Sequence, residues 1–278
     1  MSSSGQPQRT WITRLRHAPF PWDARPERAT SGERYPPETY ACDEVLLHLS
    51  PELAGADARG PLAVVVWLHG QQATLRGRVL EGARVPDQID GVGAPLALVA
   101  PQLALNARDS CPGKLEEPGG LARLLDEAAV LFARGGDPEP FRGAPVVLAA
   151  FSGGYRAAAA CLARGGRPVS AVLLMDALYA RLDDFVQWRI REPAGALVTL
   201  YGASTEANTL ALEASLAAAG VPAGAALSPR VRPGDVRLIR VYTEHMAIPS
   251  AGPPASPLTA VLRDLLEVTD VAVGAARV

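Results

Sequence analysis

Short apolar runs alternate along this chain with longer stretches of helical spacing. Continuous apolar runs, rich in β-branched residues, predict strands buried on both faces at 63–68, 96–100, 145–151, 171–175 and 196–201. The run at 44–49 predicts a strand near a sheet edge, and 236–242 predicts the last strand. Apolar residues at helical spacing predict helices at 120–133, 155–163, 208–219 and 257–268. This alternation is typical of a mainly parallel sheet with helices on both faces.

The first 40 residues follow a different pattern. They are rich in proline and arginine and lack helical or strand periodicity, yet they contain five aromatic residues, Trp11, Phe20, Trp22, Tyr35 and Tyr40. Because a wholly disordered tail rarely contains so many aromatics, residues 1–40 are predicted to form an arm that lies across the rest of the protein. Residues 41–278 show no internal repeat and are predicted to form a single α/β domain.

Composition narrows the class of protein. The 278 residues are 48% hydrophobic and 20% charged, which is typical of a globular chain. The formal net charge of -2, with arginines scattered along the chain, gives no electrostatic reason to expect a nucleic-acid partner. No stretch approaches 18 consecutive apolar residues, so no membrane-spanning helix is expected. The start of the chain lacks the apolar core of a secretory signal, which favours the cytoplasm, although a leader removed earlier would leave the same sequence.

Cofactor and metal motifs are absent from the sequence. The three cysteines, Cys42, Cys111 and Cys161, are too few and too scattered for a disulfide framework. The sequence has neither a Cys-x-x-Cys pair nor two histidines four residues apart, so no metal site is expected. No glycine-rich phosphate-binding loop is present, so neither a nucleotide nor another cofactor is predicted.

The strongest chemical signal is the segment AAFSGGYRAAAA, in which a buried strand leads into Ser152 and a helix follows at once. This pattern is typical of a nucleophile elbow, a strained strand-to-helix turn that exposes a serine hydroxyl above the sheet. Small residues are needed on either side because strand and helix nearly touch there. Gly154 meets that need, whereas Ala150 stands where glycine is usual. The backbone N–H of Gly153 is a candidate donor to a substrate oxyanion.

A second signal is WLHG at 67–70, where a strand runs into a His-Gly turn. In a sheet with a nucleophile elbow, the loop after this strand supplies the second oxyanion donor, which here would be the backbone N–H of Gln71. His69 fits a residue that braces this loop better than it fits a catalytic base. Both His69 and Gln72 are also candidate substrate contacts.

The third signal is His245 in VYTEHMAIPS, after the last strand and before the final helix. A catalytic base must come from this late loop, because the loop arrives beside the elbow. His17 falls in the arm and His48 within a strand, and both precede the serine, so His245 is the predicted base.

The acid that would orient His245 is less defined by sequence. Asp176 ends the strand after the elbow, and Glu206 lies near the end of the next strand. Asp176 is the preferred candidate, with Glu206, Asp183 and Asp184 as alternatives. An ionised carboxylate at this position would hold the imidazole in the required tautomer.

The loop from Gln102 to Gly120 is the main polar segment near the predicted site. It follows a buried strand at the carboxyl edge of the sheet, where ligands bind in open α/β sheets. Asp109 and Lys114, the only lysine of the chain, are candidate substrate contacts. The alternative is a solvated loop whose charges are neutralised locally, for example by Glu116 and Glu117. Cys111 in this loop lacks an elbow and a neighbouring histidine, so it is not a predicted nucleophile.

The order of strand, His-Gly loop, elbow, aspartate and late histidine resembles the α/β-hydrolase superfamily over residues 44–268. The stretches APQLALNARDSCPGKLEEPGG, FSGGYRAAAA and LLMDALYARLDDFVQW are similar to a bacterial group of these serine hydrolases without a firmly assigned substrate. That resemblance implies the α/β-hydrolase fold, Asp176 as the acid, and a role for the 102–120 loop in shaping the site. Too few residues separate Asp176 from the next strand for a large cap, which favours an open cleft.

These features together predict a serine hydrolase that cleaves an ester or amide bond of a small-molecule or peptide-like substrate through an acyl-enzyme. A thioesterase or acyltransferase would use the same triad. A non-catalytic binding protein on the same scaffold is the alternative from another class, because fold does not guarantee function. The sequence leaves the oligomeric state open.

Overall fold

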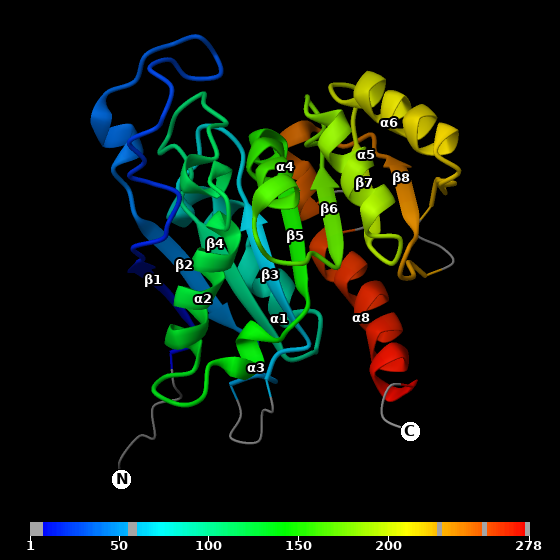
Figure 1. The fold of residues 1–278 in the computed structure, drawn as a ribbon, viewed down its shortest axis with the longest axis horizontal. Coiled ribbons are helices and arrows are strands. Elements are labelled where there is room, and N and C mark those ends of the chain that lie inside the picture. The colour runs from blue at the N-terminus through cyan, green and yellow to red at the C-terminus, as the bar shows by residue number, and fades with distance from the viewer. Residues whose placement is uncertain (1–7, 55–59, 227–229, 252–254, 276–278) are drawn as a thin grey trace.

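The computed structural model describes residues 8–54, 60–226, 230–251 and 255–275. Eight strands in this part of the chain form one twisted sheet (Figure 1). Their bounds are β1 (Thr10–Arg14), β2 (Glu44–Leu49), β3 (Ala63–Leu68), β4 (Leu96–Pro101), β5 (Val146–Phe151), β6 (Ala171–Met175), β7 (Ala196–Tyr201) and β8 (Val236–Arg240).

The strands are arranged in the order β1-β2-β4-β3-β5-β6-β7-β8. β3 to β8 run parallel to one another, whereas β2 is antiparallel to both β1 and β4. After β3 the chain adds β4 on one side, and it then returns to place β5 on the other side of β3. The direction of winding therefore reverses beside β3, which in open α/β sheets is where ligands bind.

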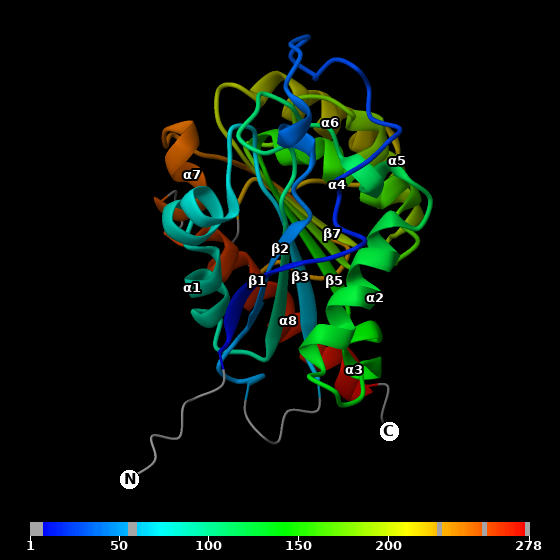
Figure 2. The ribbon, with the colours of Figure 1, turned by 90° about the vertical axis from the view of Figure 1, so that its left-hand side faces the viewer.

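Helices cover both faces of the sheet, as the two perpendicular views show (Figures 1 and 2). One face carries α2 (Gly120–Phe132), α3 (Glu139–Arg142), α4 (Tyr155–Arg164), α5 (Leu182–Arg191) and α6 (Glu206–Ala218). The other face carries the π-helix η2 (Leu75–Gly82), α1 (Val85–Asp90), α7 (Ile248–Ala251) and α8 (Pro257–Ala275). Four 3-10 turns complete the described elements: η1 (Pro37–Tyr40), η3 (Gly113–Glu116), η4 (Ser152–Gly154) and η5 (His245–Ala247).

Each face of the sheet has its own apolar core. Alternate residues of the same strand serve the two sides, so Val64 and Val66 pack with α2 and α4 while Val65 and Trp67 pack with η2, α1 and α8. Trp67 is among the largest fully buried side chains. Burial on both faces explains why β3 to β7 are continuous apolar runs, and the predicted mainly parallel sheet with helices on both faces is confirmed.

The arm departs from its prediction at one place. Residues 10–14 were expected to lack strand structure, but they form β1, which pairs with β2 along its whole length. The sequence TWITR is short and only half-buried, so it has no continuous apolar run to reveal it.

The rest of the arm packs against the 102–120 loop through aromatic side chains. Phe20 is fully buried and meets Tyr40 edge to face, with ring centroids 5.4 Å apart, and both pack near Cys111. No helix in the described residues is long and apolar enough to cross a membrane.

Candidate active site

Ser152 stands on a strained turn directly after β5. Its φ of +51° lies in the left-handed region, which a serine adopts only when the surrounding structure imposes it. Gly154 makes this turn feasible, because a Cβ at that position would collide with the backbone carbonyl oxygen of Leu68 on β3. Ala150, where glycine is usual, is fully buried beside Leu68, so the sheet accommodates its methyl group. Local strain therefore places the serine hydroxyl above the carboxyl edge of the sheet.

His245 lies between Ser152 and Asp176. Its Nε2 is 3.0 Å from Ser152 Oγ, and its Nδ1 is 2.6 Å from Asp176 Oδ2. The ring also stacks on Phe151, with centroids 4.8 Å apart. An ionised Asp176 accepts the Nδ1–H, so Nε2 is left as the acceptor for the serine hydroxyl hydrogen. The three side chains form one continuous hydrogen-bonded chain.

Asp176 is almost completely buried and accepts four hydrogen bonds. Oδ1 accepts from the backbone N–H of Gly202 at 3.0 Å and from the Thr205 hydroxyl, and Oδ2 accepts from the Ser204 hydroxyl at 2.7 Å and from His245. Burial raises the pKa of Asp176, but the hydrogen bonds from His245, Thr205, Ser204 and Gly202 outweigh it and hold the pKa well below its ordinary value. The carboxylate is therefore ionised at neutral pH.

Two backbone N–H groups converge in front of Ser152. Gly153 begins the turn into α4, and a Cβ on it would lie 3.2 Å from the backbone nitrogen of Gln71. In the part of the chain that the structure describes, neither the Gly153 nor the Gln71 N–H donates to another residue. Two free donors beside a nucleophile can stabilise the oxyanion of a tetrahedral intermediate.

The sheet register explains how these groups meet. Leu68 pairs with Ala150, so the segments after β3 and β5 emerge side by side and bring Gln71 to Gly153. Phe151 pairs with Met175, which sets Asp176 next to the elbow on the following strand. The site thus lies at the carboxyl ends of the strands where the winding reverses.

The chain has the α/β-hydrolase fold. Its nucleophile turn after β5, the His-Gly loop after β3, and the order serine, aspartate, histidine along the sequence are the features of that fold. No protein-family model matches the sequence, and no curated protein is similar to it.

Solved structures with a similar arrangement include serine hydrolases and esterases. FphF, a fluorophosphonate-binding serine hydrolase of Staphylococcus aureus, is 10% identical, with a TM-score of 0.49 over 86% of this chain and 92% of that one. The Est2 esterase of Thermogutta terrifontis is 13% identical, with a TM-score of 0.46 over 84% and 90%. An S-formylglutathione hydrolase of Agrobacterium tumefaciens is 10% identical, with a TM-score of 0.44 over 80% and 86%. Likenesses this weak do not by themselves assign an activity.

His69 braces the loop that carries Gln71. It is buried, and its Nε2 accepts from the backbone N–H of Leu103 and from the Gln102 side chain, both at 2.9 Å. Nδ1 therefore carries the hydrogen and donates to the Gly70 carbonyl at 2.7 Å. Burial lowers the pKa of His69 to about 4, so the ring is neutral. With both nitrogens engaged, His69 is not a substrate hydrogen-bonding group.

Gln102 was not among the sequence candidates. Its buried amide also accepts from the backbone N–H of Leu75 and donates to the carbonyl of Ala73. It thus ties β4 to both ends of the loop between β3 and η2.

Ser204 and Thr205, which hold Asp176, were missed as well. Their only sequence signal is a hydroxyl pair directly after a strand, which many loops share.

The other candidate substrate residues are engaged away from Ser152. Asp109 is buried and accepts from the backbone N–H of Thr30 and from the Tyr40 hydroxyl, so it binds the arm. The Lys114 ammonium donates to the Arg16 carbonyl at 3.0 Å, and Lys114 lines neither of the two cavities beside Ser152.

The remaining alternatives are also placed by the structure. Gln72, with a φ of +52°, donates its backbone N–H to Ala107 and does not line the cavity around Ser152. Glu206, the alternative acid, pairs with Arg240 rather than His245. Asp184 pairs with Arg181. Burial raises the pKa of the Cys111 thiol to about 11, so this cysteine is a neutral thiol.

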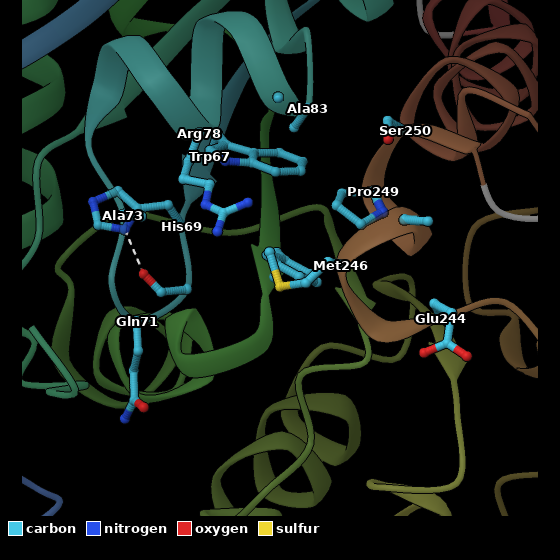
Figure 3. Close-up of a pocket in the computed structure, with 14 residues that line it drawn as sticks. Trp67, His69, Gln71, Ala73, Arg78, Ala83, Glu244, Met246, Pro249 and Ser250 are labelled. Carbon is cyan, nitrogen blue, oxygen red and sulfur yellow. Dashed lines mark hydrogen bonds between the residues drawn. The ribbon is translucent and has the colours of Figure 1, made fainter. Parts of the chain in front are cut away.

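Two cavities flank the nucleophile. One, of about 380 Å³, is lined by Ser152 itself, by the arm residues Thr30 and Ser31, and by Tyr155 and Tyr179. The other, of about 400 Å³, lies beyond Gly70 and Gln71 and is bordered by Trp67, Phe151 and the segment from Met246 to Ser250 (Figure 3). The first cavity gives a substrate direct access to Ser152.

Proposed function

We propose that this protein is a serine hydrolase that cleaves an ester or amide bond of a small-molecule or peptide-like substrate. The observation that supports the proposal most directly is the hydrogen-bonded chain Ser152–His245–Asp176, with separations of 3.0 and 2.6 Å, beside two unpaired backbone N–H groups. A nucleophile, a base and an orienting acid at these distances form the arrangement that acyl transfer requires.

In the proposed reaction Ser152 Oγ attacks the substrate carbonyl carbon, and the hydroxyl proton passes to His245 Nε2. The carbonyl oxygen becomes an oxyanion that accepts hydrogen bonds from the Gln71 and Gly153 N–H groups. The carbon–leaving-group bond then breaks, and His245 returns the proton to the leaving oxygen or nitrogen. Asp176 remains ionised throughout and stabilises the imidazolium.

Deacylation repeats the sequence with water as the nucleophile. His245 Nε2 takes a proton from the water, whose oxygen attacks the acyl carbon, and the same proton then goes to Ser152 Oγ as the acyl bond breaks. The acid product and the free enzyme are released. The cavity that Ser152 lines leaves space for that water.

Covalent labelling tests the proposal directly. The full-length protein is treated with a fluorophosphonate probe, and the modified peptide is identified by mass spectrometry. We expect modification of Ser152, and loss of labelling in Ser152→Ala. Hydrolysis of short-chain 4-nitrophenyl esters should fall by roughly three to six orders of magnitude in that variant. Ser215→Ala, at a half-buried serine on α6, is the matched control and should behave like the parent. Retained labelling in Ser152→Ala would refute the assignment.

A further inference from the structure

Two residues in the wall of the 400 Å³ cavity beyond the Gln71 loop, which Figure 3 shows, contact the catalytic centre. Gly70, in its wall, packs so close to the nucleophile that a Cβ there would lie 2.8 Å from Ser152 Cβ. Phe151, in the same wall, stacks on His245. The cavity therefore lies directly beside Ser152 and His245, the two groups that would act on the reacting carbon.

Most of the cavity wall is apolar. Trp67 lies on β3 and Phe151 on β5, and Met246, Ala247 and Pro249 come from the segment that follows His245. Met246 is 49% exposed, so its side chain is accessible to a ligand in the cavity. These walls fit a short hydrocarbon chain.

Arg78 is the cationic side chain of the cavity. It projects from η2, and in Figure 3 its guanidinium points into the space between the loop of His69 and the segment of Met246. Among the described residues, no carboxylate lies within ion-pair distance of its guanidinium, and none of their polar atoms accepts a hydrogen bond from the guanidinium N–H groups. Many other arginines of the chain are paired, including Arg84, which follows η2 and bonds Asp87. The guanidinium fork of Arg78 is free for a ligand.

Glu244 limits what that ligand can be. It also lines the cavity, but in Figure 3 it lies on the far side of Met246 from Arg78, and no ion pair joins the two in the described structure. With one positive and one negative group at its border, the cavity carries no net charge from these residues. A monoanion held at Arg78 is therefore better accommodated than a dianion such as a phosphate monoester.

We propose that this cavity is a subsite for a substrate portion that ends in a carboxylate, which Arg78 binds through its guanidinium while the apolar walls hold the connecting chain. Guanidinium and carboxylate match in a planar, two-bond geometry that a neutral end group cannot form. The inference rests on the proposed hydrolase function, because it assigns part of the substrate of the same site.

Matched ester pairs test the subsite. One pair places the charge in the acyl portion: 4-nitrophenyl hydrogen adipate against 4-nitrophenyl methyl adipate. The other places it in the alcohol portion: the butyrate ester of 3-hydroxybenzoate against that of 3-hydroxybenzamide. We expect kcat/KM to favour the carboxylate in at least one pair, and Arg78→Gln to reduce that ratio by about fivefold or more, with the larger part in KM. Added salt should weaken the preference in the parent.

Arg76→Gln is the matched control, because it removes an equal charge from the same helix at a residue outside the cavity wall. It should leave the ratio unchanged. A ratio that is the same in the parent and in Arg78→Gln for both ester pairs would overturn the subsite.

A binding measurement separates this inference from the hydrolase proposal. Monomethyl adipate is titrated calorimetrically into Ser152→Ala and into Ser152→Ala/Arg78→Gln, so no turnover is needed. The second variant should bind about fivefold more weakly, whereas dimethyl adipate should bind both equally. If the parent hydrolyses no ester, the hydrolase proposal fails and this titration still decides the subsite. Equal affinities, or no binding to either variant, would refute it.

Discussion

The substitution Asp176→Asn tests the orientation of His245 with little change in volume. The structure indicates which way the new amide would turn. Oδ1 of Asp176 accepts from two fixed donors, the Gly202 N–H and the Thr205 hydroxyl, so the amide oxygen of asparagine would occupy that position. The amide NH₂ would then face His245 Nδ1 and Ser204, in the place of Oδ2.

This orientation reverses the tautomer of the histidine. An NH₂ group donates to Nδ1, which forces the imidazole hydrogen onto Nε2, and Nε2 can no longer accept the Ser152 proton. Loss of the correct tautomer with intact geometry costs about four orders of magnitude in kcat in a serine-protease triad, which serves here as the reference magnitude. We therefore expect a loss of about a thousandfold to ten-thousandfold in kcat for Asp176→Asn.

The assay is hydrolysis of a 4-nitrophenyl ester, together with the rate of fluorophosphonate labelling and a thermal melt that checks folding. Glu206→Gln is the matched control, since Glu206 is the alternative acid by sequence but pairs with Arg240. It should retain activity within about twofold, as expected when an exposed pair is lost. If Asp176→Asn keeps more than a tenth of the parent activity, or if Glu206→Gln loses as much, the reasoning is wrong.

Two further predictions concern residues that contact the loop of Gln71. Gly153→Ala adds a methyl group 2.6 Å from Ser110 Oγ and 2.8 Å from Gln71 Cγ, so it should displace the Gln71 N–H. We expect kcat to fall roughly a hundredfold, with the surface substitution Gly143→Ala measured as the control. His69 has a folded pKa of about 4 against 6.5 for the free side chain, so its contribution to stability is full above about pH 6.5 and is lost as the pH falls toward 4. In denaturant unfolding, the free energy of unfolding that is lost across this pH window should be smaller in His69→Gln than in the parent, by up to about 3 kcal/mol. Part of the slope should remain in both proteins, because burial also lowers the pKa of His48. An unchanged slope would contradict the neutral, buried His69.

The strands were predictable because burial on both faces leaves an unbroken apolar run in the sequence. The predicted spans 63–68, 171–175 and 196–201 match β3, β6 and β7 residue for residue. Elements that mix polar with apolar residues were harder to predict. β1 is half-buried, and α5, with the sequence LDDFVQWRIR, places charged residues between its buried aromatic side chains. Sequence periodicity thus reveals a strand buried on both faces more readily than a short element whose apolar pattern is interrupted by charges.

The same limit applies to the site. That Ser152 and His245 lie together could be predicted, because their positions relative to strands constrain where they can lie in space. Gln102 and Ser204 act through contacts between loops that are far apart in the sequence, and no local pattern encodes such a contact. For Asp109 the difficulty is of another kind. It was predicted to contact the substrate because it is a charged residue in a loop near the site, but its hydrogen-bond partners lie in the arm.

The hydrogen bonds between the 102–120 loop and the arm change the interpretation of the arm. Asp109 accepts from Thr30 and Tyr40, and the Ser110 N–H donates to the Thr30 hydroxyl at 2.9 Å, so the loop fixes the arm over the cavity that contains Ser152. Thr30 and Ser31 then become part of the cavity wall, in the position where a separate cap would otherwise stand. Because these contacts are hydrogen bonds of a few residues rather than a packed helical layer, substitutions at Thr30 should alter substrate selectivity more readily than substitutions in the sheet. Asp109 therefore influences substrate selectivity by holding the arm in place, and not by direct contact with the substrate.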